Sequence, residues 1–430
     1  MKLLVVAHPE SAHTAHWVNQ IVGQGWKIRL FSSSENGATN PELKKVRVYQ
    51  SFYGSKYNKN KEIKIIGIPV FSHVLAFGFR FALKLFFPRY QEWYLRRVIR
   101  EFQPDIIHSI EIQHAGYLVN EIKKNWRSKF PKWIVTNWGS DIYFFQKFPK
   151  HLEKIREVLE NCDYYSCECN RDVCLAEKYG LQGKVLPVFP NSGGFNLKKL
   201  KKIRDKTKPS KRKAIVVKGY HGWAGRALVA LNALDRCGSL ISGYELIIYS
   251  IQPGTGVRAA AKLLAQKYNL KLTLVPLHTP REEILKCHAK ARISIGLSVT
   301  DAISTMVLEA MVMGSLPIQS NTSCADEWIE NGQTGIIVPP ENSKIIEKAI
   351  RKALANDKFV DRASRANWQT ALKRIDSKLI KKRIIDFYKF VLRDEVDLSL
   401  RRLRYIGNKS GMIQSLNQLE KGTDDESILD

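Results

Sequence analysis

Two carboxylates, Asp301 and Glu309, are separated by seven residues around the expected start of a helix. The run STMVLEAMVM is helix-forming, Ser304 or Thr305 is a suitable N-cap, and Gly314 is a suitable stop. The open N-terminus of such a helix offers unpaired N–H groups and the positive end of the dipole, which suit a phosphate. Carboxylates do not bind phosphate, but they accept hydrogen bonds from sugar hydroxyls. The pattern therefore predicts a site for a nucleotide-sugar.

The stretch from residue 298 to residue 340 resembles the donor-binding signature of family 4 retaining glycosyltransferases of the GT-B fold. That signature usually begins with Glu and here begins with Asp301, while EAMVMGSLPIQS and DEWIENGQTGIIVPP resemble its continuation. The resemblance implies that Glu309 holds the nucleotide ribose and Asp301 the transferred sugar; the alternative for Glu309 is a solvated helix position. The amides implied to hold the sugar and phosphates belong to Ser304, Thr305, Met306 and Val307.

The segment VVKGYHGWAGRALVALNAL supplies two candidate cations for the donor diphosphate, Lys218 and Arg226. Relatives usually place an Arg and a Lys after this strand, although the intervening GYHGWAG does not have the usual spacing. The glycine-rich turn before the next helix also offers backbone N–H groups to a phosphate. The alternative for each cation is a solvated surface position.

Two motifs after N-terminal strands supply candidates on the acceptor side. HPESAHTAHW resembles the opening of bacterial family 4 enzymes that act on surface polysaccharides, and its His13 is a candidate contact for acceptor or phosphate. The alternative for His13 is a cap or a packed side chain. In PDIIHSIEIQHAGYL, three residues compete for the position of a family histidine: His108, Glu111 and His114. Glu111 and His114 are three residues apart, so they share a face on a helical turn.

A third N-terminal motif, TNWGSD, resembles T-x-H-G-x-D in relatives, with Trp138 in place of the His. Gly139 allows close backbone approach, and Asp141 can take a sugar hydroxyl or cap the following helix. The candidate catalytic residues are therefore Glu111, His114 and Asp141. A fourth motif, PNSGGFNL, is expected to be structural.

Strand and helix signals alternate twice along the chain, which predicts an α/β protein with two doubly wound parallel sheets. The resemblance implies that these Rossmann-like domains face each other across a cleft. We predict an acceptor domain over residues 1–195, a basic linker over 196–213 and a nucleotide-sugar domain over 214–375. A helix over 376–400 is expected to cross back to the first domain, followed by a mobile tail over 401–430.

The 430-residue chain carries a formal net charge of +28, which attracts nucleic acid, anionic lipid or diphosphates. Between Arg80 and Arg100, cations alternate with aromatic residues, a composition that suits the headgroup region of an anionic membrane. The alternative is that the aromatic face packs inside the N-terminal domain. The run from Lys198 to Lys213 is expected to be exposed and able to touch headgroups. No nucleic-acid fold signature accompanies either run, so no specific nucleic-acid partner is expected.

The cysteines and the absence of a secretory signal favour a reducing compartment. The chain has seven cysteines, an odd number, and KLLVVAHP leads directly from the start into a strand. The apolar stretch from Val70 to Pro88 contains His73, Arg80 and Lys84, so a spanning helix is not expected. We therefore expect a cytoplasmic protein, peripheral at the inner face of the cytoplasmic membrane.

Four crowded cysteines raise the question of a metal site. Their spacing lacks the paired CxxC motifs of structural zinc, so half-buried thiols are the favoured interpretation. They are Cys162, Cys167, Cys169 and Cys174.

The expected chemistry requires neither a metal nor a cofactor. No D-x-D motif stands in a suitable loop, and fixed cations with a helix N-terminus can neutralise a leaving diphosphate. The resemblance implies retention of configuration by front-side attack, with a UDP- or GDP-linked sugar as donor and a lipid-linked saccharide as acceptor. The alternatives are a non-catalytic nucleotide-sugar, membrane or RNA-binding protein, or another GT-B enzyme such as an epimerase or phosphorylase.

Overall fold

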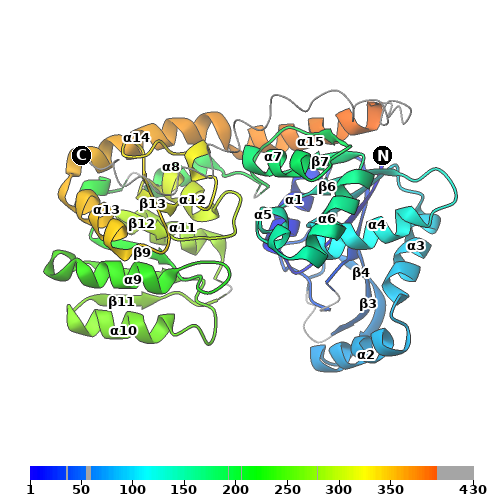
Figure 1. The fold of residues 1–430 in the computed structure, drawn as a ribbon, viewed down its shortest axis with the longest axis horizontal. Helices are drawn as coiled ribbons and strands as arrows, with labels where there is room; N and C mark the ends of the chain where they lie inside the picture. The colour runs from blue at the N-terminus through cyan, green and yellow to red at the C-terminus, as the bar shows by residue number, and fades with distance from the viewer. Residues whose placement is uncertain (35–36, 55–59, 192, 205, 278, 395–430) are drawn as a thin grey trace. The chain divides into compact units, whose positions relative to one another are not determined.

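Two parallel β-sheets, each accompanied by helices, form the framework of the protein (Figure 1). This computed structural model describes residues 1–34, 37–54, 60–191, 193–204, 206–277 and 279–394. The predicted tail over 401–430 and the end of the predicted crossing helix lie outside the described residues. Residues Met1–Leu392 cluster as one unit that holds both sheets.

The N-terminal sheet has eight strands in the order β4-β3-β2-β1-β5-β6-β7-β8, and every described pairing is parallel. Its central strands are short runs of Val, Ile and Leu that are buried on both faces, as a covered parallel sheet requires. The strands are β1 (Lys2–Ala7), β2 (Lys27–Ser32), β3 (Arg47–Gly54), β4 (Lys64–Val70), β5 (Ile106–Ile110), β6 (Lys132–Thr136), β7 (Tyr164–Ser166) and β8 (Lys184–Val185). The helices of this half are α1 (Ala12–Ile21), α2 (His73–Phe86), α3 (Tyr90–Phe102), α4 (Tyr117–Lys124), α5 (Ser140–Tyr143), α6 (Pro149–Asn161) and α7 (Asn170–Lys178).

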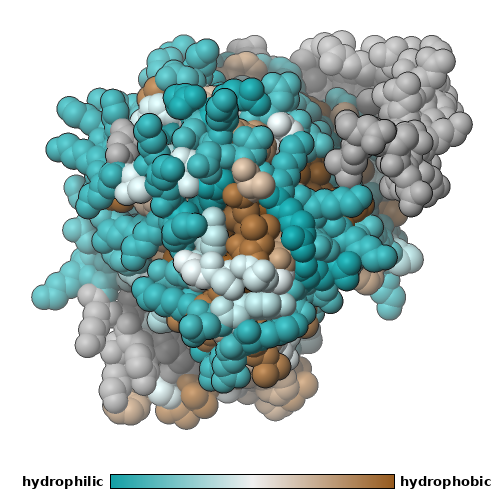
Figure 2. Space-filling view, turned by 90° about the vertical axis from the view of Figure 1, so that its left-hand side faces the viewer, coloured by the Kyte–Doolittle hydropathy of each residue, from teal (hydrophilic) through white to brown (hydrophobic). Residues whose placement is uncertain are grey.

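The C-terminal sheet has six parallel strands in the order β11-β10-β9-β12-β13-β14. The strands are β9 (Ala214–Lys218), β10 (Glu245–Tyr249), β11 (Lys271–Leu274), β12 (Ile293–Gly296), β13 (Leu316–Ser320) and β14 (Ile336–Val338). The helices in this part of the chain are α8 (Leu197–Arg204), α9 (Ala227–Arg236), α10 (Val257–Lys267), α11 (Arg281–Lys290), α12 (Thr305–Met313), α13 (Ser343–Ala355) and α14 (Asp357–Arg374), followed by α15 (Ser377–Arg393). Figure 2, which views the side where α9, α10 and α13 lie in Figure 1, shows a mainly hydrophilic face with a small hydrophobic strip.

The prediction of two doubly wound parallel sheets is confirmed. The strand signals of the sequence all correspond to strands of the structure: KLLVVAHP, KIRLFSS, PDIIHSIE, KWIVTNWGSD and DYYSCEC in the first half, and KAIVVKGY, ELIIYS, LTLVPL, ARISIGLS, LPIQS and GIIVPP in the second. Ser304 and Gly314 occupy the N-cap and C-cap positions of α12. Three strands of the N-terminal sheet, β3, β4 and β8, were not expected. β3 mixes polar and aromatic residues, β4 is an exposed edge strand with Gly and Pro, and β8 has two residues, so none carries a clear apolar signal.

Helix α15 packs against the N-terminal sheet although it follows the C-terminal one in the chain. The Tyr388 hydroxyl accepts a hydrogen bond from Trp17 Nε1 at 2.8 Å and lies 2.6 Å from His108 Nδ1. Phe387 is also buried and contacts both Trp17 and His108. These contacts connect the last described helix with α1 and β5.

The basic segment over 196–213 is exposed only in part: its eight lysines are exposed, as expected, but other residues of the segment are buried. Part of it forms α8, whose Leu197 and Leu200 are buried in the same core as helix α12. Arg204 Nη2 donates to the Ser364 carbonyl at 2.7 Å, and Arg212 Nη1 donates to the Met313 carbonyl at 3.0 Å. Arg204 and Arg212 therefore bind backbone carbonyls inside the protein and do not face a membrane. The domain boundaries stay predictions.

The segment from Arg80 to Arg100 fits the expectation only in part, because most of its cations and several of its aromatic residues are exposed but Arg80 is not. The Arg80 side chain is buried and donates to the Phe52 carbonyl at 2.7 Å, so it is not a headgroup cation. Helix α3 buries one apolar face against the sheet, through Leu95, Val98 and Phe102. Among the described residues, no helix is both long enough and apolar enough to cross a membrane.

Candidate active site

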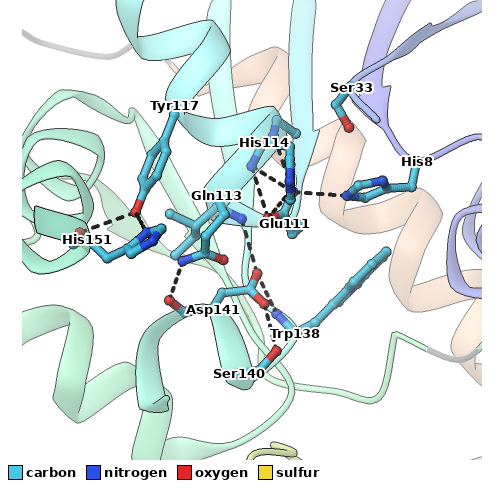
Figure 3. Close-up of polar contacts among 12 residues, drawn as sticks. His8, Ser33, Glu111, Gln113, His114, Tyr117, Trp138, Ser140, Asp141 and His151 are labelled. Atoms are coloured by element: carbon cyan, nitrogen blue, oxygen red, sulfur yellow. Dashed lines mark hydrogen bonds and ion pairs between the residues drawn. The ribbon is translucent and has the colours of Figure 1, made fainter. Parts of the chain in front are cut away.

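The carboxyl ends of β1 and β5 bring together three side chains, His8, Glu111 and His114 (Figure 3). His8 Nε2 lies 3.3 Å from Glu111 Oε2, and His114 Nδ1 lies 3.1 Å from Glu111 Oε1. Glu10 extends the cluster, because its carboxylate lies 3.4 Å from His8 Nδ1. Parallel strands place their carboxyl ends at one edge, which is where ligands bind in α/β sheets.

Glu111 occupies an unusual backbone conformation, with φ 86° and ψ 141°. It precedes one turn of π-helix, η2 (Ile112–Gly116), whose amides bind the Glu111 carboxylate: His114 N donates at 3.0 Å and Ala115 N at 3.3 Å. A positive φ is costly for a residue other than glycine and clusters at functional sites. The backbone of Glu111 is therefore strained at the residue whose carboxylate lies in the cluster.

Contacts among Glu10, His8, Glu111 and His114 determine the protonation states of His8 and Glu111. Burial alone would lower the pKa of His8, but hydrogen bonds to Glu10 and Glu111 raise it to about 9. Burial alone would raise the pKa of Glu111, but hydrogen bonds from His114 and His8 lower it to about 2. His8 is therefore an imidazolium and Glu111 a carboxylate at neutral pH.

Asp141 lies beside this cluster and is almost fully buried. Its Oδ2 accepts hydrogen bonds from Ile112 N at 3.1 Å and Trp138 N at 3.2 Å. Burial, together with the charge of Glu111, raises the pKa of Asp141 to about 7. Asp141 therefore links the turn after β6 to the turn after β5, because backbone amides of both turns bind its carboxylate.

Gly139 makes the close approach that the sequence analysis attributed to it. Its φ is 98°, and a Cβ built there would lie 2.2 Å from Ala302 N, in the segment before α12. Only a residue without a Cβ fits this contact.

The second group of candidate residues surrounds the N-terminus of α12. Lys218, at the carboxyl end of β9, is buried and places Nζ 3.1 Å from Asp301 Oδ2 and 3.4 Å from Ser304 Oγ. Burial alone would lower the pKa of Lys218, but the charge of Asp301 raises it. Ser304 is the N-cap of α12, yet its hydroxyl caps no amide of the helix and is directed to Lys218 instead.

Glu309 is buried on the same helix, near two basic side chains of α11. Arg281 Nε lies 3.7 Å from Glu309 Oε1, and His288 Nε2 lies 3.5 Å from Glu309 Oε2. Burial alone would raise the pKa of Glu309, but contact with His288 and the charges of Arg281 and Lys218 lower it. The 3.5 Å separation is too long for a well-formed hydrogen bond, so Oε2 can still accept one from a ligand.

His13, on α1, is within electrostatic reach of this second group. Burial, His16 and Arg281 lower the pKa of His13 to about 4, while Asp301 acts in the opposite direction. The His13 ring also lies 5.2 Å from the Trp138 ring. His13 is therefore neutral at pH 7 and sits among residues from both sheets.

Two expected candidates lie elsewhere. Arg226 is directed to Glu341 and to the carbonyls of Gly222 and Gly225, so it is not gathered with Lys218 and Asp301. His108 is buried within β5, between Tyr388 and Thr136. Of the three residues that competed for the position after β5, Glu111 and His114 reach the cluster and His108 does not.

Three residues of the site were missed by sequence reasoning: His8, Arg281 and His288. His8 is the first residue of the HPESAHTAHW motif. Glu111 lies more than a hundred residues later, and nothing in the sequence shows that the two side chains meet. Arg281 and His288 lie on an ordinary amphipathic helix, α11, and their relation to Glu309 is purely tertiary.

Two groups of described residues have side-chain atoms close enough to hold a metal ion, within 4.8 Å of one another. One is the cluster His8, Glu111 and His114. The other consists of Cys169, Cys324 and Glu327. Of the four cysteines that are crowded in the sequence, only Cys169 belongs to such a group among the described residues. Cys162 and Cys167 are buried and Cys174 is exposed on α7. That the reaction needs no metal stays a prediction.

Two family models match the chain. Residues 199–370 match "Glycosyl transferases group 1", and residues 73–168 match "Glycosyl transferase 4-like". No curated protein matches the sequence.

Several solved structures share the fold. Sucrose-phosphate synthase from Thermosynechococcus elongatus is 14% identical with a TM-score of 0.66, and 90% of this chain and 98% of that chain are covered. HepE of Anabaena, solved in complex with UDP-glucose, is 13% identical with a TM-score of 0.64, covering 90% and 99%. A glycosyltransferase from Rickettsia africae is 17% identical with a TM-score of 0.61, covering 92% and 99%. The structures show that the chain has the GT-B fold, and the two matched regions are similar to glycosyltransferases of group 1 and of the family 4-like group.

Proposed function

We propose that this protein transfers a sugar, with retention of configuration, from a UDP- or GDP-linked donor to a lipid-linked saccharide. The observation that carries the donor assignment is the position of Lys218. Its ammonium group lies between the Asp301 carboxylate and the Ser304 hydroxyl, at the N-terminus of the helix that also holds Glu309. A buried cation beside an open helix N-terminus suits a diphosphate, and the two carboxylates suit hydroxyl groups.

Each donor residue then has a role set by its chemistry. Glu309 accepts hydrogen bonds from the ribose hydroxyls, and Asp301 accepts them from the transferred sugar. Lys218 and the amides of residues 304–307 hold the phosphates. Arg226 joins them only after leaving Glu341, so its contribution depends on a rearrangement of the loop after β9.

The reaction uses this charge at the moment of bond cleavage. As the glycosidic bond breaks, negative charge develops on the nucleoside diphosphate, and Lys218 with the dipole of α12 neutralises it. The acceptor hydroxyl attacks from the same face, and a donor phosphate oxygen takes its proton. The products are the glycosylated acceptor and the nucleoside diphosphate; no cofactor or metal is required by this scheme.

The acceptor side is assigned to the cluster at the edge of the N-terminal sheet. Glu111 accepts a hydrogen bond from the incoming hydroxyl group, and His114, whose side chain is 60% exposed, contacts the same sugar. Asp141 fixes the loops after β5 and β6, and His13 contacts acceptor or phosphate.

The proposed acceptor is a lipid-linked saccharide in surface-polysaccharide assembly, such as O-antigen, capsule or exopolysaccharide. The resemblance of HPESAHTAHW to enzymes of that kind supports it, as does the net charge of +28, which favours an anionic membrane surface. The Anabaena relative binds UDP-glucose, which supports a nucleotide-sugar donor. The proposed location is the cytoplasmic face of the membrane.

The test is a transfer assay with UDP- and GDP-sugars, extracted bacterial lipid acceptors and EDTA. The proposal expects nucleoside diphosphate release that depends on acceptor, persists in EDTA and gives a product with the donor's anomeric configuration by NMR. Lys218→Met should reduce the rate by about a hundredfold or more, because one charged group at the leaving diphosphate is lost. Lys262→Met, at an exposed position on α10, is the matched control. A product of inverted configuration would overturn the retaining mechanism.

A further inference from the structure

Helix α2 presents an apolar face to the outside of the N-terminal half. Seven apolar residues of the helix and its ends are each between 64% and 80% exposed. These are Phe71, Val74, Phe77, Phe81, Leu85, Phe86 and Phe87. Exposed apolar patches of this extent are rare on soluble proteins and mark sites of interaction.

The polarity of α2 is the reverse of that expected for a surface helix. Its buried residues are Ala76 and Arg80, which face the sheet, and Arg80 Nη1 donates to the Phe52 carbonyl. Phe79 stacks on Phe52 at 5.5 Å, which fixes the helix against β3. Figure 1 shows α2 beside the ends of β3 and β4, where its outer face is free of other helices. Ala76 and Arg80 occupy the positions that face the sheet, and Phe77, Phe81 and Phe86 lie on the exposed side.

The charges around α2 favour anionic lipid as the occupant of this face. No Asp or Glu occurs between Glu62 and Glu92, whereas Lys64, Lys84 and Arg89 are exposed. A second copy of the chain would bring the same cations together and, at a net charge of +28 each, be repelled. An apolar face bordered by cations matches the boundary between acyl chains and anionic headgroups.

The position of α2 connects this face with the acceptor site. The helix begins just after the carboxyl end of β4, and β1 and β5 end at the same edge of the sheet with His8 and Glu111. α2 has 14 residues, so it can lie in the interface without spanning the bilayer.

We propose that α2 inserts its phenylalanine face into the surface of an anionic bilayer and so holds the acceptor edge of the N-terminal sheet at the lipid. The benefit for catalysis rests on the proposed function, but the lipid binding does not. This assigns to the outer face of α2 the membrane contact that the sequence predicted for residues 80–100.

The experiment is vesicle flotation of the full chain with phosphatidylcholine vesicles, with and without phosphatidylglycerol. The test variant is Phe77→Ser with Phe81→Ser, and the matched control is Leu263→Ser, an exposed leucine on α10. We expect binding to anionic vesicles that weakens with salt, and a drop on the order of tenfold or more in the partition coefficient of the double variant. The control should bind like the wild type.

Equal binding by the double variant and the wild type would overturn the inference, as would an equal loss in the control. Light scattering without vesicles adds a further test: a wild-type dimer that the double variant dissociates would make a second copy the occupant. Thermal shift with UDP and GDP separates the two proposals. A chain that binds vesicles but no nucleotide would refute the proposed function and leave the membrane inference standing.

Discussion

Replacing Glu111 by Gln should change the titration of His8, because the two side chains form an ion pair across the edge of the N-terminal sheet. The substitution keeps the shape of the side chain but removes its charge. Among the described residues, Glu10 is then the only carboxylate left in contact with His8. The variant therefore separates the contribution of Glu111 from that of Glu10.

The magnitude follows from the pKa of His8. A rise from 6.5 to about 9 corresponds to about 3 kcal/mol, shared between the two carboxylates. Because the folded pKa is the higher one, this stabilisation is fully present below pH 6.5 and is lost as the pH rises through 9. Glu111→Gln should lower the pKa of His8 by about one unit or more. The unfolding free energy that the variant loses between pH 6.5 and pH 9 should then be roughly half of what the wild type loses.

The assay is an NMR titration of the histidine ring protons, with His8→Gln to assign the signal and urea unfolding at pH 6 and pH 10 in parallel. Glu101→Gln, which removes a carboxylate from an exposed pair with Arg97, is the matched control and should leave His8 unchanged. A wild-type His8 that titrates near 6.5 would refute the reasoning, as would the same pKa in wild type and Glu111→Gln.

Three further changes test the fold around the site by urea unfolding. Gly139→Ala should lower the free energy of unfolding by about 2–4 kcal/mol, because its Cβ would clash with a backbone nitrogen before α12. Gly222→Ala, at a similar φ in open space, should lower it by only about 1 kcal/mol. Equal costs would contradict the clash. Tyr388→Phe should cost about 1–3 kcal/mol, since it leaves buried partners on α1 and β5 unpaired, and no loss would contradict that network. Leu200→Ala should cost about 2–4 kcal/mol if α8 is packed, but close to none in an exposed linker; Leu263→Ala is the exposed control.

The sequence predicted the parts of the fold that depend on local signals. Helix α12 is an example: its cap, its apolar run and its terminal glycine stand next to one another in the chain, and each has the expected place in the structure. Strand β9 is also a nearly continuous run of β-branched and aliphatic residues. Strand β3 and the edge strand β4 were missed because their residues are partly exposed and carry no such pattern.

The candidate site was harder to predict because it depends on distant contacts. Lys218 was named for its place at a strand end, and the structure puts it at Asp301, 83 residues away. Arg226 was named by the same reasoning, but a surface carboxylate, Glu341, holds it. Arg281 gave no local signal, since only the packing of α11 against α12 brings it to Glu309.

The basic segment over 196–213 shows a different limit. Its charge density indicated an exposed linker, yet the backbone carbonyls at the ends of buried elements need donors, and Arg204 and Arg212 supply them. Composition alone cannot tell an arginine that faces lipid from one that caps a carbonyl.

The most direct test of the donor-site assignment is isothermal titration calorimetry of UDP and GDP with the wild type and Glu309→Gln. The variant keeps the shape of the side chain but loses the carboxylate that accepts the ribose hydroxyls. Glu283→Gln, an exposed position on α11, serves as the control. We predict that the wild type binds one of the two nucleotides and that Glu309→Gln weakens this binding by about tenfold or more. A folded wild type that binds neither, or a Glu309→Gln variant that binds as well as the wild type, would contradict the assignment.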